Sequence, residues 1–255
     1  MGITIKQPKE LNAMRRAGHV VSVLHQRVAP MIQPGITTMD IDQLAKDVLV
    51  EFSAGSAFLG HQGFPGRVCV SVNEEIVHGI PSRRVLEEGD IISVDFGAII
   101  DGYFGDSAWT YPVGIISDDA AGLLKVTEEA LALGLEQATA GNRLGAIGHA
   151  IEKHVRAGNY GLIQEYGGHG IGRSMWEEPH IPNHGSPKQG PQLRAGMVLA
   201  IEPMVTTGRD ATKTLADGWT VITADKSLAA HFEHTVVITT GAPEILTKRL
   251  GVVVH

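Results

Sequence analysis

The sequence of 255 residues contains a single cysteine, Cys69, so no disulfide can form within the chain. Its N-terminus lacks the basic and apolar regions of a signal peptide, and no apolar run is long enough to span a membrane. Basic residues are outnumbered by acidic ones, giving a net charge of −7, and they form no long tract. These absences argue against a disulfide-stabilised secreted protein, a membrane protein and a nucleic-acid binder, and they predict a cytoplasmic protein.

The composition suits a soluble enzyme-sized core, with 43% hydrophobic and 19% charged residues. A chain of 255 residues is near the upper limit for one domain, and we expect a single domain over residues 1–255. A leucine, a glycine and a carboxylate recur at one constant offset, as Leu86, Gly89, Asp95 and again as Leu193, Gly196, Glu202. This pattern predicts an internal pseudo-repeat of roughly residues 8–114 and 118–241.

Hydrophobic spacing predicts helices over residues 8–31, 38–52, 118–139 and 144–156. Strands are expected over residues 68–72, 91–100 and 103–111, with the last two joined by a turn at Asp101-Gly102. In the second half we expect a glycine loop around His169 and a longer hairpin loop over residues 207–220. Since no linker separates the halves, we expect one curved sheet backed by helices.

Two carboxylates, Asp95 and Glu202, each end an apolar run that reads as a buried strand. An ionised acid in such a place costs several kcal/mol unless a cation compensates it. If the predicted turn is right, Asp95 faces Ala108, and Asp106 lies on the same face of the hairpin. The common alternative for an aspartate is a surface carboxylate or a helix cap, but the apolar flanks favour burial. We therefore predict a metal site, to which Glu233 contributes at the repeat position of Asp106.

His169 lies in a run of glycines, which lets the backbone approach a ligand and leaves the imidazole free to coordinate. The alternative is a loop histidine packed for shape. Four carboxylates and one imidazole form an oxygen-rich site that suits Mn, Fe, Co or Zn. Because four acids exceed the charge of one divalent ion, two adjacent ions are expected.

Together these motifs carry a family resemblance: VNEEIVHGIP from Val72, DFG from Asp95, GDS from Gly105, GHGIGR from Gly168, IEP from Ile201 and FEHT from Phe232. The chain resembles the type I methionine aminopeptidases over essentially its whole length. The resemblance implies the α/β (α+β) pita-bread fold, with two pseudo-symmetric halves around a central curved antiparallel sheet backed by helices. It also implies removal of the initiator methionine from nascent chains with a small second residue.

By this resemblance, Asp95 and Asp106 hold one ion, His169 and Glu202 hold the other, and Asp106 and Glu233 bridge the two. A metal-bridging hydroxide would attack the scissile carbonyl, and Glu202 is the expected acceptor of the water proton. The resemblance further implies that His78 contacts the substrate near the scissile bond.

The chain departs from the family pattern at Trp176, where relatives usually carry a histidine that contacts the substrate. Trp retains an N–H donor but has no acceptor and cannot titrate. Trp176 is therefore expected either to donate a hydrogen bond to the substrate or to form a pocket wall. His180 is a further candidate to compensate for the missing histidine.

An apolar pocket for the methionine side chain is implied at Phe64, Cys69 and Trp219, with Met175 beside them, since sulfur and aromatic surfaces favour a thioether. Each of these residues would otherwise be ordinary core. His61 and His231 stand where relatives often carry tyrosine and glutamine, which predicts a pocket of different shape.

Four other functions are alternatives to this interpretation. The triplet from Asp95 to Gly97 matches a kinase motif, and the glycines around His169 partly match a dinucleotide fingerprint, but both lack their context. A prolidase of the same fold and a non-catalytic peptide binder are the nearer alternatives. As partners we expect nascent polypeptide N-termini and a transient ribosome contact, with no nucleic-acid substrate and no membrane, for a monomeric enzyme.

Overall fold

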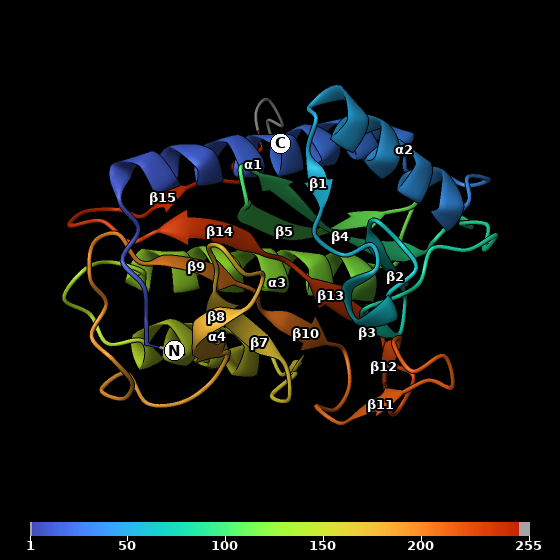
Figure 1. Cartoon of the computed structure of the whole chain (residues 1–255). Coiled ribbons are helices and arrows are strands. Elements are labelled where there is room, and N and C mark those ends of the chain that lie inside the picture. Colours follow the sequence, from blue (N-terminus) through green and yellow to red (C-terminus); the bar gives the residue numbers. More distant parts are fainter. Residues whose placement is uncertain (1, 250–255) are drawn as a thin grey trace.

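A computed structural model describes residues 2–249 of the chain (Figure 1). Its helices are α1 (Pro8–Val28), α2 (Thr38–Glu51), α3 (Asp118–Gln137) and α4 (Gly145–Ala157), with 3₁₀ turns at Ala29–Met31 and His61–Gly63. The strands of the first half are β1 (Gly55–Ser56), β2 (Cys69–Val72), β3 (Glu75–Val77), β4 (Ile91–Ile100) and β5 (Tyr103–Pro112). Those of the second half are β6 (Gly161–Leu162), β7 (Gly167–Gly170), β8 (Glu177–Pro182), β9 (Val198–Ile201), β10 (Met204–Thr206), β11 (Thr212–Thr214), β12 (Val221–Thr223), β13 (Ala229–His231), β14 (His234–Val237) and β15 (Glu244–Ile245).

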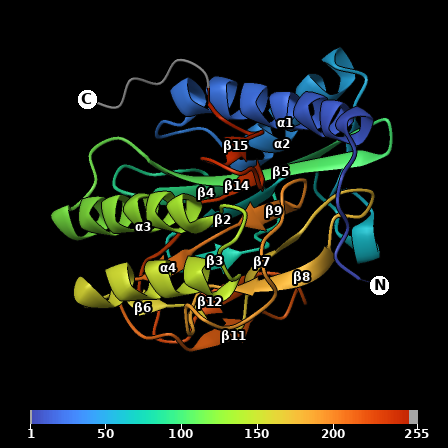
Figure 2. The same ribbon diagram turned by 90° about the vertical axis from the view of Figure 1, so that its left-hand side faces the viewer.

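The helices occupy the predicted positions and lie on two sides of the central strands (Figure 2). α1 packs against β4 and β5, whereas α3 and α4 pack together on the opposite side. α2 begins at the expected cap, where Thr37 accepts a hydrogen bond from the Asp40 N–H and the Asp40 carboxylate accepts one from the Thr37 N–H. No helix within residues 2–249 is both long and apolar enough to cross a membrane.

The hairpin of β4 and β5 has the predicted register, with Asp95 opposite Ala108 and Asp106 opposite Gly97. Its turn uses Asp101 at φ 51° and Gly102 at φ 75°. Positive φ at both central residues suits the twist of a tight two-residue hairpin. The opposite edge of β4 pairs with β1 and β2.

The repeated leucines and glycines have matching structures in the two halves. Leu86 and Leu193 are both buried, and Gly89 and Gly196 adopt φ values of 92° and 89°. The leucine and glycine of each stretch thus share the same burial and backbone conformation.

One sequence-based expectation for the second half was wrong, and a second was incomplete. His169 lies within a strand, β7, where it pairs with His180 of β8 and Ala200 of β9, and not in a loop. The glycines beside it serve close strand packing, because a Cβ at Gly168 or Gly170 would lie 2.2 Å from a main-chain oxygen of a neighbouring strand. The longer hairpin connection expected from residue 207 is present, since Thr206 of β10 pairs with Ala229 of β13. It extends beyond residue 220 and contains a hairpin of β11 and β12, and β12 also pairs with β3 of the first half.

The two halves meet where β5 runs beside β14 and beside the residues that precede β14. We call this junction the seam, and most of its hydrogen bonds involve side chains. The Thr235 hydroxyl accepts from the Asp106 N–H at 3.1 Å and donates to the Asp106 carbonyl at 2.7 Å. Thr110 makes the same two bonds to the main chain of His231, both at 2.9 Å. Within the described residues the strands thus form four antiparallel sheets in place of the single sheet expected, and the seam joins the sheet of β5 to the strands of the second half.

Candidate metal centre and active site

The four predicted acidic ligands form two pairs, one on the hairpin of each half. The two acids of the first pair are diagonal to one another, whereas those of the second pair are directly opposite. Asp95 and Asp106 stand on adjacent strands and are diagonal to one another, since each faces an uncharged residue. Glu202 directly follows β9, and Glu233 directly precedes β14. The flanking pairs, Ile201 with His234 and Met204 with His231, place Glu202 opposite Glu233.

These carboxyl groups are buried together, and burial is the main cause of their altered acidity. It raises the pKa of Asp95, Asp106, Glu202 and Glu233, and for all but Asp106 the neighbouring negative charges raise it further. Across residues 2–249, the Asp95 Oδ1, Asp106 Oδ1 and Glu233 Oε1 atoms are buried without a hydrogen-bond partner. Buried acids without partners are costly, and a cation is the compensation that this arrangement fits.

The imidazole of His169 completes the cluster. Its Nδ1 atom donates to the Gly170 carbonyl at 2.9 Å, which leaves the Nε2 lone pair directed at the acids, 3.6 Å from Glu202 Oε1. Burial lowers the pKa of His169 to about 4, so the ring is neutral and able to act as a ligand. Asp106, His169 and Glu233 each offer an atom within 4.8 Å of the others, a spacing that could hold a metal ion.

A cavity of about 220 Å³ opens onto this cluster and brings together the site residues predicted from the sequence, with the exception of His180. The predicted pocket residues form its apolar part, where Phe64 and Trp219 meet edge to face with ring centroids 5.1 Å apart. Cys69 and Met175 lie in the same wall, and burial raises the pKa of the Cys69 thiol, which keeps it protonated. The arrangement gives a metal-binding end and an apolar, sulfur-lined end to one space.

His78 enters this cavity from a segment with a strained backbone. Its φ of 61° is rare for a residue with a side chain, and such strain persists mainly at functional positions. The ring lies edge to face with Tyr166 and Trp219, and burial lowers its pKa.

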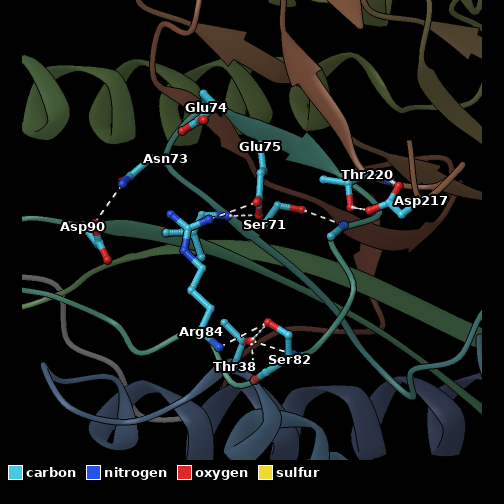
Figure 3. A network of polar contacts seen from close by, with 12 residues as sticks. Thr38, Ser71, Asn73, Glu74, Glu75, Ser82, Arg84, Asp90, Asp217 and Thr220 are labelled. Carbon is cyan, nitrogen blue, oxygen red and sulfur yellow. Dashed lines mark hydrogen bonds and ion pairs between the residues drawn. The ribbon is translucent and has the colours of Figure 1, made fainter. Parts of the chain in front are cut away.

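A polar network fixes the segment that carries His78 (Figure 3). Glu75 pairs with Arg84 at 2.9 Å and accepts from a main-chain N–H at 2.8 Å. The Ser71 hydroxyl accepts from the Gly79 N–H at 3.2 Å, directly after the strained residue. Because these contacts already fix the segment, the His78 imidazole loses little conformational entropy when a ligand binds.

Trp176 lies at the mouth of the cavity, and its side chain is 48% exposed. It also lines an adjoining larger cavity of about 870 Å³, together with His169 and His180. His180, considered above as a substitute for the family histidine, lines this second cavity and not the first.

Sequence reasoning missed several contributors to the cavity. His231 was expected only to alter the pocket shape, yet its Nε2 atom lies 3.4 Å from Glu202 Oε2, so Glu202 stands between two imidazoles. Phe58, Gln62 and Val77 also line the cavity without having been predicted. The position of His231, two residues before Glu233, is a signal that could have indicated its proximity.

Residues 12–240 match the model of metallopeptidase family M24. The chain belongs to metallopeptidase family M24. Members of this family use divalent metal, and the buried, unpartnered carboxylate oxygens described above fit that requirement.

Two M24 relatives cover nearly the whole chain. Methionine aminopeptidase 1 of Bacillus subtilis (strain 168) is 52% identical over 96% of this chain and 99% of its own length. The crystal structure of methionine aminopeptidase from Thermotoga maritima is 44% identical, with a TM-score of 0.96 over 97% of this chain and all of that one. Prolidase from Pyrococcus furiosus is 21% identical, with a TM-score of 0.78, and this chain covers 66% of it, which shows a common fold alone.

The structure also bears on the kinase and dinucleotide motifs. The triplet at Asp95 lies in the middle of β4 and not in a loop. The glycines around His169 belong to a strand that is paired on both sides and precedes another strand, so they do not open a helix. Neither motif has the structural context that its function requires.

Proposed function

We propose that this M24 chain is a metal-dependent aminopeptidase that removes the N-terminal initiator methionine from nascent polypeptides with a small second residue. The observation that carries the proposal is the single cavity in which a cluster of acids and an apolar pocket face the same space. The full-length relatives at 52% and 44% identity, both named methionine aminopeptidases, support it.

The proposed metal ligands are Asp95, Asp106, His169, Glu202 and Glu233, holding two divalent ions drawn from Co, Mn, Fe and Zn. By the family resemblance, Asp106 and Glu233 would help to hold both ions. When bound, such ions supply Lewis acidity to the scissile carbonyl and to a water molecule.

The protein side chains supply the remaining steps of the reaction. Glu202 accepts the proton of the attacking water and returns it to the leaving amine, as a general base and then a general acid. His78 contacts the peptide group at the scissile bond, and its fixed backbone keeps the imidazole positioned before substrate arrives. The metal-bearing end of the cavity would receive the free N-terminal amine of the substrate, which selects for peptides with an unblocked N-terminus.

Specificity for methionine comes from the walls of the apolar end of the cavity. Phe64, Cys69 and Trp219, with Met175, present aromatic and sulfur surfaces to a thioether side chain. Trp176 closes the mouth of the pocket as a substrate-facing residue.

Residues 1–255 act as one catalytic unit, monomeric and cytoplasmic, that meets its substrates as they leave the ribosome through a transient contact. Nucleic acid and membrane are not partners, consistent with the net charge of −7.

Peptide hydrolysis with defined metals tests the proposal. The metal-free chain, reloaded with Mn²⁺, Co²⁺, Fe²⁺ or Zn²⁺, should release methionine from Met-Gly-Met and leave Xaa-Pro peptides intact. Cleavage restricted to Xaa-Pro peptides would assign prolidase activity instead. Peptide binding without turnover under every metal would refute catalysis.

A further inference from the structure

One imidazole of the cavity has no part in the reaction outlined above. His61 lines the cavity, and among the residues that the structure describes its Nε2 atom is buried without a hydrogen-bond partner. Buried polar atoms of native proteins nearly always have partners. A group that arrives with a bound ligand would therefore satisfy the Nε2 atom.

The backbone holds His61 in a defined place. The His61 N–H donates to the Phe58 carbonyl at 2.9 Å, and its own carbonyl accepts from the Phe64 N–H at 2.8 Å. Gly60 and Gln62 on either side have φ values of 79° and 47°. The left-handed conformation of Gln62, a residue with a side chain, costs free energy that is typically retained at a functional segment.

Trp176 connects this imidazole to the proposed metal ligands. Its ring lies 4.6 Å from that of His61 and 6.0 Å from that of His169, measured between centroids. The indole has few rotatable bonds, so it can support a neighbouring ring at low entropic cost. The exposed tryptophan therefore has a packing partner across the mouth of the cavity.

We propose that His61 hydrogen-bonds the scissile peptide group of the bound polypeptide, and that Trp176 is the residue that positions its imidazole. This inference rests on the proposed function. The substrate amine goes to the metal-bearing end of the cavity, and the methionine side chain is apolar and fills the pocket. The peptide group, which His78 also contacts, has a carbonyl oxygen with two lone pairs, and one of them can accept a hydrogen bond from His61 Nε2.

This role for Trp176 differs from direct donation by the indole N–H. A platform acts through its ring, so phenylalanine can replace it, whereas a donor acts through Nε1 and phenylalanine cannot. A platform also has no effect once the ring that it supports has lost its nitrogen atoms. Substitutions at the two positions therefore separate the two roles.

The test is kcat/KM for release of methionine from Met-Ala-Ser by the metal-loaded full chain. His61→Phe, which keeps a ring without nitrogen, should lose about tenfold, the value of one hydrogen bond. His61→Gln should recover most of that loss because its amide nitrogen reaches a similar position. The kcat/KM of Trp176→Ala should fall as far as that of His61→Phe, whereas the kcat/KM of Trp176→Phe should stay within about threefold of the wild-type value. The double variant His61→Phe with Trp176→Ala should have a kcat/KM no lower than that of either single variant.

Leu59→Ala is the matched control, since it alters the same segment at a side chain that is 44% exposed. Wild-type rates for His61→Phe would overturn the role of His61. Equal losses for Trp176→Phe and Trp176→Ala, or additive losses in the double variant, would overturn the platform role. Methionine release by the wild-type chain tests the proposed function separately, so either idea can fail while the other stands.

Discussion

Replacing Thr235 by valine tests how the seam supports the metal site. Valine has nearly the same shape, so the change removes the hydroxyl while the packing is kept. Thr235 is fully buried, and the loss leaves both the N–H and the carbonyl of Asp106 without the partners that they have across the seam. Each unsatisfied buried group costs about 1–3 kcal/mol, so we expect about 3 kcal/mol of destabilisation and a melting temperature lower by about 6 °C.

Because Asp106 is a proposed bridging ligand, the same change should also weaken metal binding, by about tenfold or more. Thr110→Val is the matched control, since it removes the equivalent bonds to His231, which is not a proposed ligand. Urea unfolding followed by circular dichroism measures stability, and calorimetric titration of the metal-free protein with Mn²⁺ measures affinity. Unchanged stability in Thr235→Val would refute the seam argument. Equal losses of metal affinity in both variants would refute its local effect on Asp106.

Three further results are expected. Removing metal with a chelator should abolish methionine release and lower the melting temperature by about 5 °C, because an ion at about 100 times its Kd adds about 2.7 kcal/mol; a calorimetric scan that does not change would contradict the metal site. His78→Ala should reduce kcat/KM for Met-Gly-Met about tenfold or more with an unchanged urea midpoint, and normal kinetics would remove His78 from the reaction. Acidification from pH 6.5 to pH 4.5 should lower the free energy of unfolding of the wild type by about 2–3 kcal/mol more than that of His25→Asn. Burial lowers the pKa of His25 to about 4 in the folded chain, whereas the same group has its ordinary pKa of 6.5 in the unfolded chain, which therefore binds the proton first. Urea unfolding at both pH values checks this, with His19→Asn on the exposed side of the same helix as control, and equal losses in wild type and His25→Asn would refute it.

The parts of the fold that could be predicted from the sequence are those set by local rules. The hairpin of β4 and β5 follows from an Asp-Gly turn, which fixes the register and so the face on which Asp95 and Asp106 lie. The start of α2 follows from the threonine cap and the aspartate three residues later. Both features depend on residues that are close in the chain.

The parts that could not be predicted depend on contacts distant in sequence. The glycines around His169 have low strand propensity, and they form β7 because neighbouring strands approach too closely for any side chain. Likewise, β12 is a strand because β3, from the other half of the chain, pairs with it. The contact between His61 and Trp176 joins two segments whose proximity no local pattern indicates.

The seam has a consequence for how the proposed ions exchange with solution. Apart from the bond that the Glu233 N–H donates to the Ala108 carbonyl, the bonds described at the seam run through hydroxyl groups. The proposed ligands Asp106 and Glu233 lie on its two sides. A breathing motion that separates β5 from β14 would therefore pull the coordinating atoms apart in the same event. Metal dissociation and amide-proton exchange along these strands should therefore share one opening rate, and bound metal would stabilise the contact between the two halves.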